Sequence, residues 1–542
     1  MILMNKRVLL ISPSPYFNLK NSDGVGIQGT LPQLIKNENM SIRYLSASLK
    51  DKGFECDIID CQLEGKSDQD ILEKIEDSEY LFIGISLSVQ TIFKDIISLI
   101  VKIKTRYSGK IVVGGQFASI EYLNILKNYH AIDIVVIGEG EETICSLANN
   151  LSLGKDISNL KGVAQRDFEG NVHSNGSNWI DNLDSLAYPD RTGIEHVIRA
   201  KQRITIISKR GCYGKCSYCS NISYYGEKKN LRFRSPENVF NEVSEIYREH
   251  KWNRFVFHDE IFVDKSIRGM KWLKEFHALI KQEDLVLDLW VKLRANDCDD
   301  DLLKLLFEIG VKTIFLGVEA GNDNSLKRFK KMSTASDNTQ AVNTCLKYGF
   351  KVNIGYIMFE PYMSFSDLIK NYEWISQYSF SEPQNFYSYL LPFNGTLVEK
   401  QLLKDNLLQK NEWFEMGTYN FADSKVSFVY DILSKYKNKI SETEYYVNVA
   451  RVLLFDMEKK YDLVKARTLL NNAISDFSLN VNLLFANILV EVNDSSDFPS
   501  WISDKCRDFR YENYSINTEN IKSVCESIID ECLLLKNNDI SA

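Results

Sequence analysis

Three cysteines lie within residues 210–220, which read Arg210-Gly211-Cys212-Tyr213-Gly214-Lys215-Cys216-Ser217-Tyr218-Cys219-Ser220. Their spacing is C-x3-C-x2-C, and an apolar run typical of a strand precedes them at 204–208. Three thiolates this close in sequence can bind one soft metal centre. An iron–sulfur cluster normally takes four protein ligands, so three would leave one iron open to another molecule. The stretch therefore predicts a reactive iron–sulfur site at the end of a strand.

Three other interpretations of the cysteines are possible. A zinc site would need a fourth ligand, and no Cys or His lies between Cys219 and His250. A disulfide is typical of secreted proteins, and the N-terminal residues do not have the pattern of a secretion signal. Buried free thiols would suit an apolar segment, whereas this one is polar and contains two glycines. The pattern favours a metal cluster over all three.

The first 155 residues alternate short apolar runs with amphipathic stretches, which predicts a Rossmann-like parallel sheet covered by helices on both faces. Strands are expected over 7–12, 55–60, 80–86, 110–113 and 133–137. A G-x-G-x-x-G match at 24–29 starts twelve residues after the first strand, which favours a loop over a dinucleotide site.

A second series of strand and helix patterns begins near residue 201. Strands are expected over 203–208, 254–258, 286–291, 312–317, 351–358 and 385–391. Six such units predict a partial (β/α)6 barrel of the TIM type over 201–400, with the cysteines at the carboxyl end of its first strand. Residues 156–200 form the expected linker. Residues 401–542 predict a mainly helical region, whose default role is packing and whose alternative role is capping a substrate or binding a peptide.

The cysteine spacing, with an aromatic residue before the last cysteine, resembles the signature of the radical S-adenosylmethionine (SAM) superfamily. The resemblance implies that Cys212, Cys216 and Cys219 hold a 4Fe-4S cluster whose open iron binds SAM. An electron from the cluster would then cleave SAM to a 5′-deoxyadenosyl radical. It also implies SAM contacts from Tyr218 and from Gly317 and Glu319 at the fourth barrel strand. A packing role for Tyr218 and an ion pair for Glu319 are the alternatives.

The N-terminal region resembles the cobalamin-binding domain that many radical SAM enzymes carry. The resemblance rests on small and glycine residues where its predicted strands end, which would let a flat ligand approach the backbone. The D-x-H-x-x-G motif that supplies a histidine to cobalt is absent, so cobalamin would bind without a protein ligand from below. The implied cobalamin contacts are Gly84, Ser86, Leu87, Gly114, Gly115, Gly138 and Glu139.

The composition indicates which binding partners and which cellular location to expect. A net charge of −8 argues against a general affinity for nucleic acids or anionic membranes. No apolar run reaches the length of a membrane span. Eight further cysteines are scattered through the chain, which is typical of reduced thiols. We therefore expect a cytoplasmic protein that meets a small-molecule or peptide substrate and an electron donor such as flavodoxin or ferredoxin.

Taken together, these patterns predict an enzyme that transfers a methyl group to an unactivated carbon in a biosynthetic pathway. It would use SAM twice, once to methylate cobalamin and once to form the radical. Cyclisation or rearrangement of a natural-product or cofactor precursor is the first alternative. An iron–sulfur protein that only carries electrons or senses redox state is the second, although a pure carrier should use four cysteines.

Overall fold

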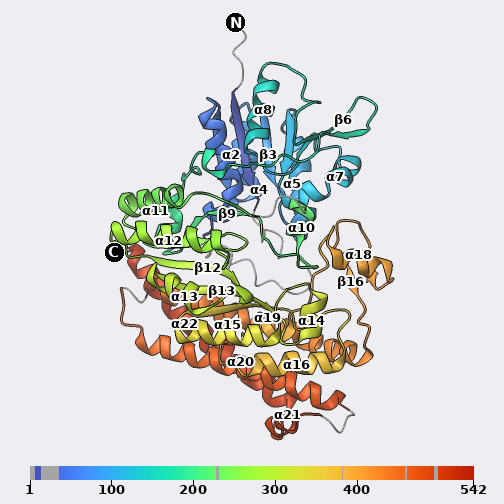
Figure 1. Ribbon diagram of the computed structural model, residues 1–542, viewed down its shortest axis with the longest axis vertical. Helices are drawn as coiled ribbons and strands as arrows, with labels where there is room; N and C mark the ends of the chain where they lie inside the picture. The colour runs from blue at the N-terminus through green and yellow to red at the C-terminus, as the bar shows by residue number, and fades with distance from the viewer. Residues whose placement is uncertain are drawn as a thin grey trace.

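The computed structural model describes residues 6–13, 36–226, 231–380, 382–457, 460–493 and 498–541. Along its longest axis an N-terminal sheet, a second sheet and a set of long C-terminal helices follow one another (Figure 1). The sequence therefore builds the mixed α/β architecture that its patterns predict. The G-x-G-x-x-G match at 24–29 lies outside the described residues.

The N-terminal sheet is parallel through its first five strands in chain order, as the sequence predicts. Two further strands extend it antiparallel, and the spatial order is β2-β1-β3-β4-β5-β6-β7. Both added strands lie in the range expected to be a linker, so the sheet continues past residue 155. The strands are β1 (Arg7–Ser12), β2 (Glu55–Asp60), β3 (Phe82–Ser86), β4 (Lys110–Gly114), β5 (Ile134–Val136), β6 (Val163–Arg166) and β7 (Val172–Ser174).

Alternating apolar side chains explain why helices cover both faces of this sheet. Val8 and Leu10 of β1 pack in one buried cluster, whereas Leu9 and Ile11 pack in another, because successive side chains of a strand point to opposite faces. The first cluster is closed by α2 (Met40–Asp51) and α8 (Glu141–Ser152). The second is closed by α3 (Cys61–Glu64), α4 (Asp68–Glu76), α5 (Phe93–Lys104), α6 (Gln116–Ile120) and α7 (Tyr122–Asn128).

The second sheet contains five parallel strands in the order β14-β13-β12-β11-β8. They are β8 (Ile204–Ile206), β11 (Arg254–Phe257), β12 (Asp288–Arg294), β13 (Val311–Glu319) and β14 (Lys351–Tyr356). A short antiparallel ribbon of β9 (Lys209–Arg210) and β10 (Arg232–Phe233) follows β8. The helix α9 (Ile194–Arg199) leads into this sheet from the expected linker.

The sixth barrel strand expected over 385–391 is not formed. Residues Gln384–Tyr387 make one helical turn, α17, and the segment then touches the sheet only through an isolated bridge between Tyr389 and Phe359. Pro383 at the start of the turn has helical backbone angles, and Pro392 soon after has no N–H to donate to a ladder. The barrel is therefore partial, with five strands and a sixth position marked by one bridge.

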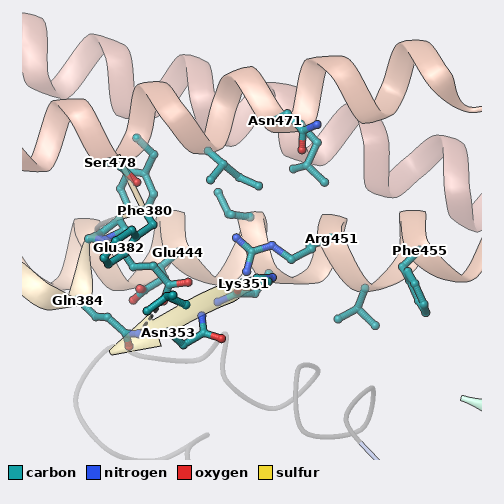
Figure 2. Close-up of a pocket in the computed structure, with 18 of the residues that line it drawn as sticks. Lys351, Asn353, Phe380, Glu382, Gln384, Glu444, Arg451, Phe455, Asn471 and Ser478 are labelled. Carbon is teal, nitrogen blue, oxygen red and sulfur yellow. Dashed lines mark hydrogen bonds between the residues drawn. The ribbon is translucent and has the colours of Figure 1, made fainter. Parts of the chain in front are cut away.

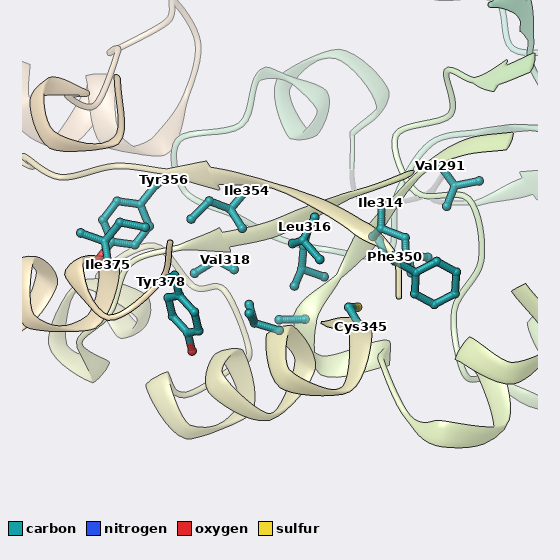
Figure 3. Close-up of a cluster of buried hydrophobic side chains, with 14 of the residues drawn as sticks. Val291, Ile314, Leu316, Val318, Cys345, Phe350, Ile354, Tyr356, Ile375 and Tyr378 are labelled. Carbon is teal, nitrogen blue, oxygen red and sulfur yellow. The ribbon is translucent and has the colours of Figure 1, made fainter. Parts of the chain in front are cut away.

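Helices cover the outer face of the second sheet. Figure 3 shows Val291, Ile314, Leu316 and Val318 of its strands packed toward helix residues such as Cys345. The helices are α11 (Pro236–His250), α12 (Ile267–Gln282), α13 (Asp300–Glu308), α15 (Ala335–Lys347) and α16 (Phe365–Ser376), whereas α14 (Asp323–Arg328) packs in a separate cluster. The sequence signals the start of α11, since Ser235 caps it and Pro236 occupies its first position.

The C-terminal region is mainly helical, as expected. It contains α18 (Leu397–Lys404), the β15 (Leu408–Gln409) and β16 (Thr418–Tyr419) ribbon, α19 (Ser424–Met457), α20 (Val464–Val492), α21 (Ser500–Lys505) and α22 (Tyr511–Ser541). Within the described residues, α20 alone is long and apolar enough to cross a membrane. More than half of its apolar window is buried against the rest of the chain, which is typical of a core helix.

A partly buried arginine, Arg191, joins the N-terminal domain to the second sheet. Both oxygens of Glu38, just before α2, lie 3.0 Å from Nη1 of Arg191. Nη2 of Arg191 lies 2.6 Å from Glu242 of α11. The two carboxylates are 0% and 3% exposed, so the guanidinium compensates charges that water cannot reach.

Replacing Arg191 with alanine should lower the free energy of unfolding by about 3 kcal/mol, because Glu38 and Glu242 each lose one cationic partner and keep only Arg43 and Arg234. Urea unfolding followed by circular dichroism at pH 7 measures this change. The matched control is Lys52→Ala, which removes an exposed ion pair with Asp51 and should change stability by about 0.5 kcal/mol or less. A loss below about 1 kcal/mol for Arg191→Ala would contradict the assignment.

Candidate functional site

The three cysteines lie on the loop that connects β9 to α10 (Ser220–Tyr225), at the carboxyl end of the first barrel strand. Cys219 is the residue that precedes α10. Gly211 has a positive φ of 89°, which favours glycine. Gly214 has no room for a side chain, because a Cβ there would contact the guanidinium of Arg294 and lie 3.3 Å from the Cys212 sulfur. The glycines therefore allow a tight loop around the thiols.

Two N–H groups donate to the cysteine sulfurs. The Gly214 amide lies 3.3 Å from the Cys212 Sγ, and Nη1 of Arg294 lies 3.4 Å from the Cys216 Sγ. Arg294 is held in place by a hydrogen bond to the Lys331 carbonyl and by the Tyr213 ring, 5.2 Å away. A buried guanidinium aimed at sulfur is compensated only when that sulfur carries negative charge.

Cys212 and Cys219 resist ionisation without a metal. Burial, opposed in part by Gly214 and Arg294 and reinforced by Cys216, raises the pKa of Cys212. Burial together with the charges of Cys216 and Cys212 raises the pKa of Cys219 to about 12. In the described part of the chain no three Cys, His, Asp or Glu side chains already have the spacing of metal ligands. The donor set nevertheless fits an iron–sulfur cluster, since it is all sulfur and has N–H donors on two members.

The predicted SAM residues gather beside this loop. Burial and the carboxylate of Glu319 raise the pKa of Tyr218, whose ring packs edge-on against Phe329 at 5.3 Å. Glu319 ends β13 with a left-handed φ of 69° at a β-bulge. Its Oε1 lies 2.8 Å from the Nζ of Lys331, so the ion pair considered from the sequence is present. A role of Glu319 in SAM binding stays a prediction.

Gly317 allows this ion pair to form inside the barrel. A Cβ at position 317 would lie 2.7 Å from the Lys331 Nζ and 3.0 Å from the Glu319 Oε1. Lys331 is 3% exposed, so the pair is shielded from water. The predicted residues Tyr218, Gly317 and Glu319 therefore form one polar group with Lys331, which the sequence did not single out.

The predicted cobalamin residues divide between two environments. Ser86, Gly114 and Gly115 lie at the carboxyl ends of β3 and β4, where ligands of parallel sheets bind. Gly84 does not lie at that edge. It sits inside β3, where a Cβ would lie 2.7 Å from a Leu10 methyl, so close packing of the strand accounts for it. The Leu87 side chain is fully buried in the core, and only its backbone reaches the edge.

Gly138 and Glu139 contact the second domain. The Gly138 carbonyl accepts a hydrogen bond of 2.8 Å from the Tyr224 hydroxyl of α10. Glu139 pairs with Arg232 at 2.6 Å and with Arg210 at 3.4 Å. Burial alone would raise the pKa of Glu139, but the two guanidinium groups hold it below its ordinary value. The Glu139 side chain is thus engaged between the domains.

The inner face of the barrel leads away from the cysteine loop. Along β12, Leu289, Val291 and Leu293 are buried on the outer face, which places Trp290, Lys292 and Arg294 on the inner face. Directly after β11, burial and the nearby charge of Lys292 lower the pKa of His258 to about 4, so this histidine is neutral at pH 7.

The sequence contained a signal for Arg294 but not for Lys331. Arg294 is the last residue of β12, at the carboxyl end of a barrel strand where catalytic groups gather. Lys331 follows α14 in an irregular segment, and its approach to Glu319 depends on a β-bulge that no local pattern reveals. Arg210 precedes the cysteines directly, yet its partners are about 70 residues away in the other domain.

Two family models match the chain. Residues 36–148 match the B12 binding domain, and residues 206–375 match the radical SAM superfamily. The chain therefore belongs to the radical SAM enzymes that carry a B12-binding domain. The cofactors of this family are a 4Fe-4S cluster, SAM and cobalamin.

Curated relatives include a cyclase and a methylase. The chain is 27% identical over 315 residues to an anaerobic magnesium-protoporphyrin IX monomethyl ester cyclase of Synechocystis, covering 56% of this chain and 61% of the relative. It is 25% identical over 362 residues to the hopanoid C-3 methylase of Methylococcus capsulatus, covering 65% and 64%. The matches span less than two thirds of both relatives.

A solved structure shares the fold over nearly the whole chain. The cobalamin-dependent SAM radical enzyme OxsB, with aqua-cobalamin bound, superposes with a TM-score of 0.78 at 17% identity. The alignment covers 99% of this chain and 81% of OxsB. It therefore includes the C-terminal helices as well as the two sheets.

The raised thiol pKa predicts slow alkylation of Cys219 in the folded, metal-free chain. At pH 8 a thiol of pKa about 12 has roughly a thousandfold less thiolate than one of ordinary pKa. The rate with iodoacetamide, measured at this residue by peptide mass spectrometry, should fall by at least a hundredfold relative to the urea-unfolded chain. It should rise about tenfold per pH unit above pH 8. Equal rates in the folded and unfolded chain would contradict the assignment.

Proposed function

We propose that this enzyme transfers a methyl group to an unactivated carbon of its substrate, in a reaction started by radical cleavage of SAM. The observation that carries the proposal is the contact between the cysteine loop and the ligand-binding edge of the N-terminal sheet. The helix α10 directly follows Cys219, and its Asn221 accepts a hydrogen bond of 2.9 Å from Gln116 of α6. The two predicted cofactor sites thus share a boundary.

Cys212, Cys216 and Cys219 are the proposed cluster ligands. When bound, the cluster supplies the electron that cleaves SAM. Around it, the Gly214 amide and the Arg294 guanidinium direct N–H groups toward sulfur, which stabilises the additional negative charge of a reduced cluster. The backbone of Ser217 fixes the loop, because its N–H donates to the Phe329 carbonyl at 2.9 Å.

Tyr218, Gly317 and Glu319 are the proposed SAM contacts. Glu319 and Lys331 form a buried pair of opposite charges. SAM carries an ammonium and a carboxylate group, so such a pair can orient it through complementary charges. Gly317 leaves room for the pair itself, since a side chain there would collide with both charged groups, and the Tyr218 ring provides an apolar surface.

The proposed cobalamin site is the carboxyl edge of the N-terminal sheet. There Ser86, Gly114 and Gly115, the backbone of Leu87, and Gly138 offer polar groups and close approach. Cobalamin, when bound, supplies the methyl group. Gly84 acts through strand packing and Glu139 through its ion pairs with the barrel.

Cyclisation is the second candidate, and the Synechocystis cyclase match supports it. Both reactions need the same cluster and SAM residues, so the cysteine loop does not discriminate between them. We further propose a cytoplasmic location and a flavodoxin or ferredoxin as electron donor. The eleven free cysteines of the described residues support a reducing compartment.

The reconstituted protein should convert SAM to 5′-deoxyadenosine when given a strong reductant without oxygen. Cys216→Ala should lose cluster iron and reduce the product by at least a hundredfold, because the cluster loses one of its three ligands. Cys145→Ala, on α8, is the matched control and should retain both. Iron and product are measured by colorimetry and chromatography.

An intact cluster that yields no 5′-deoxyadenosine would exclude the radical reaction. Full iron content in Cys216→Ala would show that the ligand assignment is wrong. The absorption spectrum after reconstitution with cobalamin then tests the methyl-transfer candidate. A protein that does not retain cobalamin would exclude methyl transfer.

Arg294→Gln should make the cluster harder to reduce. It removes a charge-assisted hydrogen bond to Cys216 worth about 1.5 kcal/mol, which corresponds to roughly 60 mV for a one-electron couple. A redox titration followed by electron paramagnetic resonance should therefore give a more negative potential. Arg294→Lys, which keeps the charge, should give a smaller shift. An unchanged potential in Arg294→Gln would contradict the contact.

A further inference from the structure

A cavity of about 1890 Å³ lies at the end of the barrel opposite the cysteine loop. Its wall includes Arg203, Arg254 and Lys351, which lie at the amino ends of barrel strands. The helices α19 and α20 close it from the other side, so the C-terminal region forms its floor (Figure 2). A volume this large exceeds most small-molecule sites, which hold about 300–1,000 Å³.

The cavity and the proposed radical site share the inner face of the barrel. Trp290 of β12 lines the cavity. Lys292 and then Arg294 follow it on the same face of this strand, and Arg294 contacts Cys216. Four residues of strand span about 13 Å. The cavity therefore adjoins the interior through which a substrate would reach the radical.

The strand β14 makes the same connection on another side. Its first residue, Lys351, and Asn353 line the cavity. Gly355 lies on the same face of β14, and a Cβ added there would be 3.3 Å from the Glu319 carboxylate. A molecule held at Lys351 can thus extend along β14 toward the proposed SAM residues.

The cavity wall is strongly basic although the whole chain has a net charge of −8. Among the described lining residues there are nine lysines and arginines but only two glutamates. Asp288 compensates two of the arginines, at 2.7 Å from Arg203 and 3.1 Å from Arg254. A low-dielectric cleft lined by one sign of charge concentrates ions of the opposite sign.

Two of the cations, Lys351 and Arg451, come from opposite walls of the cavity. Both side chains are exposed, and no ion pair or hydrogen bond joins either to a described residue. Figure 2 shows Arg451 extending from α19 toward Lys351 and Asn353 of β14. The nearby Glu444 accepts a hydrogen bond from Tyr387, and burial raises its pKa while the charge of Arg451 lowers it.

We propose that the substrate of this enzyme carries an anionic group, phosphate or carboxylate, that Lys351 and Arg451 bind at the foot of the barrel. The inference rests on the proposed function, because it takes the cavity to be the substrate end of the same active site. The anion compensates the two cations. The body of the substrate then lies beside the Trp290 ring and points its reactive carbon toward the cysteine loop.

The substrate class can be tested with three probes that share one apolar ring system. They are 1-naphthyl phosphate, 1-naphthylacetate and the neutral 1-naphthalenemethanol. Binding to the reconstituted full-length protein is measured by titration calorimetry at fixed ionic strength. At least one anion should bind tenfold more tightly than the neutral probe, and the tighter anion identifies phosphate or carboxylate as the group. Equal binding of all three would overturn the proposal.

Variants locate the anion. Lys351→Gln and Arg451→Gln should each weaken binding of the preferred anion by about tenfold and leave the neutral probe unchanged. Lys351→Arg should restore most of the affinity, because it keeps the charge. Lys271→Gln on α12, whose partner is the exposed Glu275, is the matched control and should change nothing. Unchanged anion affinity in both glutamine variants, with normal circular dichroism, would overturn the proposal.

The outcome is separable from that of the proposed function. Probe binding needs no radical, whereas 5′-deoxyadenosine formation by the wild-type protein needs no naphthyl probe. Loss of SAM cleavage with intact anion selectivity would count against the radical reaction alone. Normal SAM cleavage without anion selectivity would overturn the anionic substrate alone.

Discussion

The ion pairs of Arg210 determine where the two domains meet. Arg210 stands two residues before the first cysteine, and its guanidinium lies 2.5 Å from Glu141 and 3.4 Å from Glu139 of the N-terminal domain. Both carboxylates are almost fully buried. Separating the domains would deprive Arg210, Arg232 and the two glutamates of these partners in a poorly solvated region, which costs several kcal/mol. The cysteine loop is therefore attached to the sheet edge that it faces, and its distance from a ligand on that edge cannot vary freely.

The loop itself combines opposing requirements. Low exposure raises the pKa of Cys212 and Cys219, which disfavours their thiolates. Yet Arg294 and the Gly214 amide point N–H groups at sulfur, where they are best compensated by an anionic sulfur. Metal binding resolves this conflict because it displaces the protons. A similar balance holds at Glu319, where a left-handed backbone and a buried charge are retained through one contact with Lys331. Such local costs are typical of functional sites.

Much of the fold could be predicted because it follows local periodicity. The strands of the N-terminal sheet and the start of α11 at Ser235-Pro236 depend on neighbouring residues alone. The prediction was wrong at 385–391, where an apolar stretch long enough for a strand is shaped by Pro383 and Pro392. In the site, the cysteine spacing is a local signal. The pairing of Glu139 with Arg232 is not, because charged residues reveal their partners only after the domains assemble.

The floor of the cavity and the cysteine loop come from different parts of the chain. Helices α19 and α20 supply Arg451 and much of the floor, whereas β9 and α10 flank the cysteines. Residues this far apart with no shared partners contribute almost independently to stability and binding. Substitutions in the C-terminal helices can therefore accumulate without disturbing the cluster. An ancestor could exchange one substrate for another by altering these helices while the radical chemistry was inherited intact.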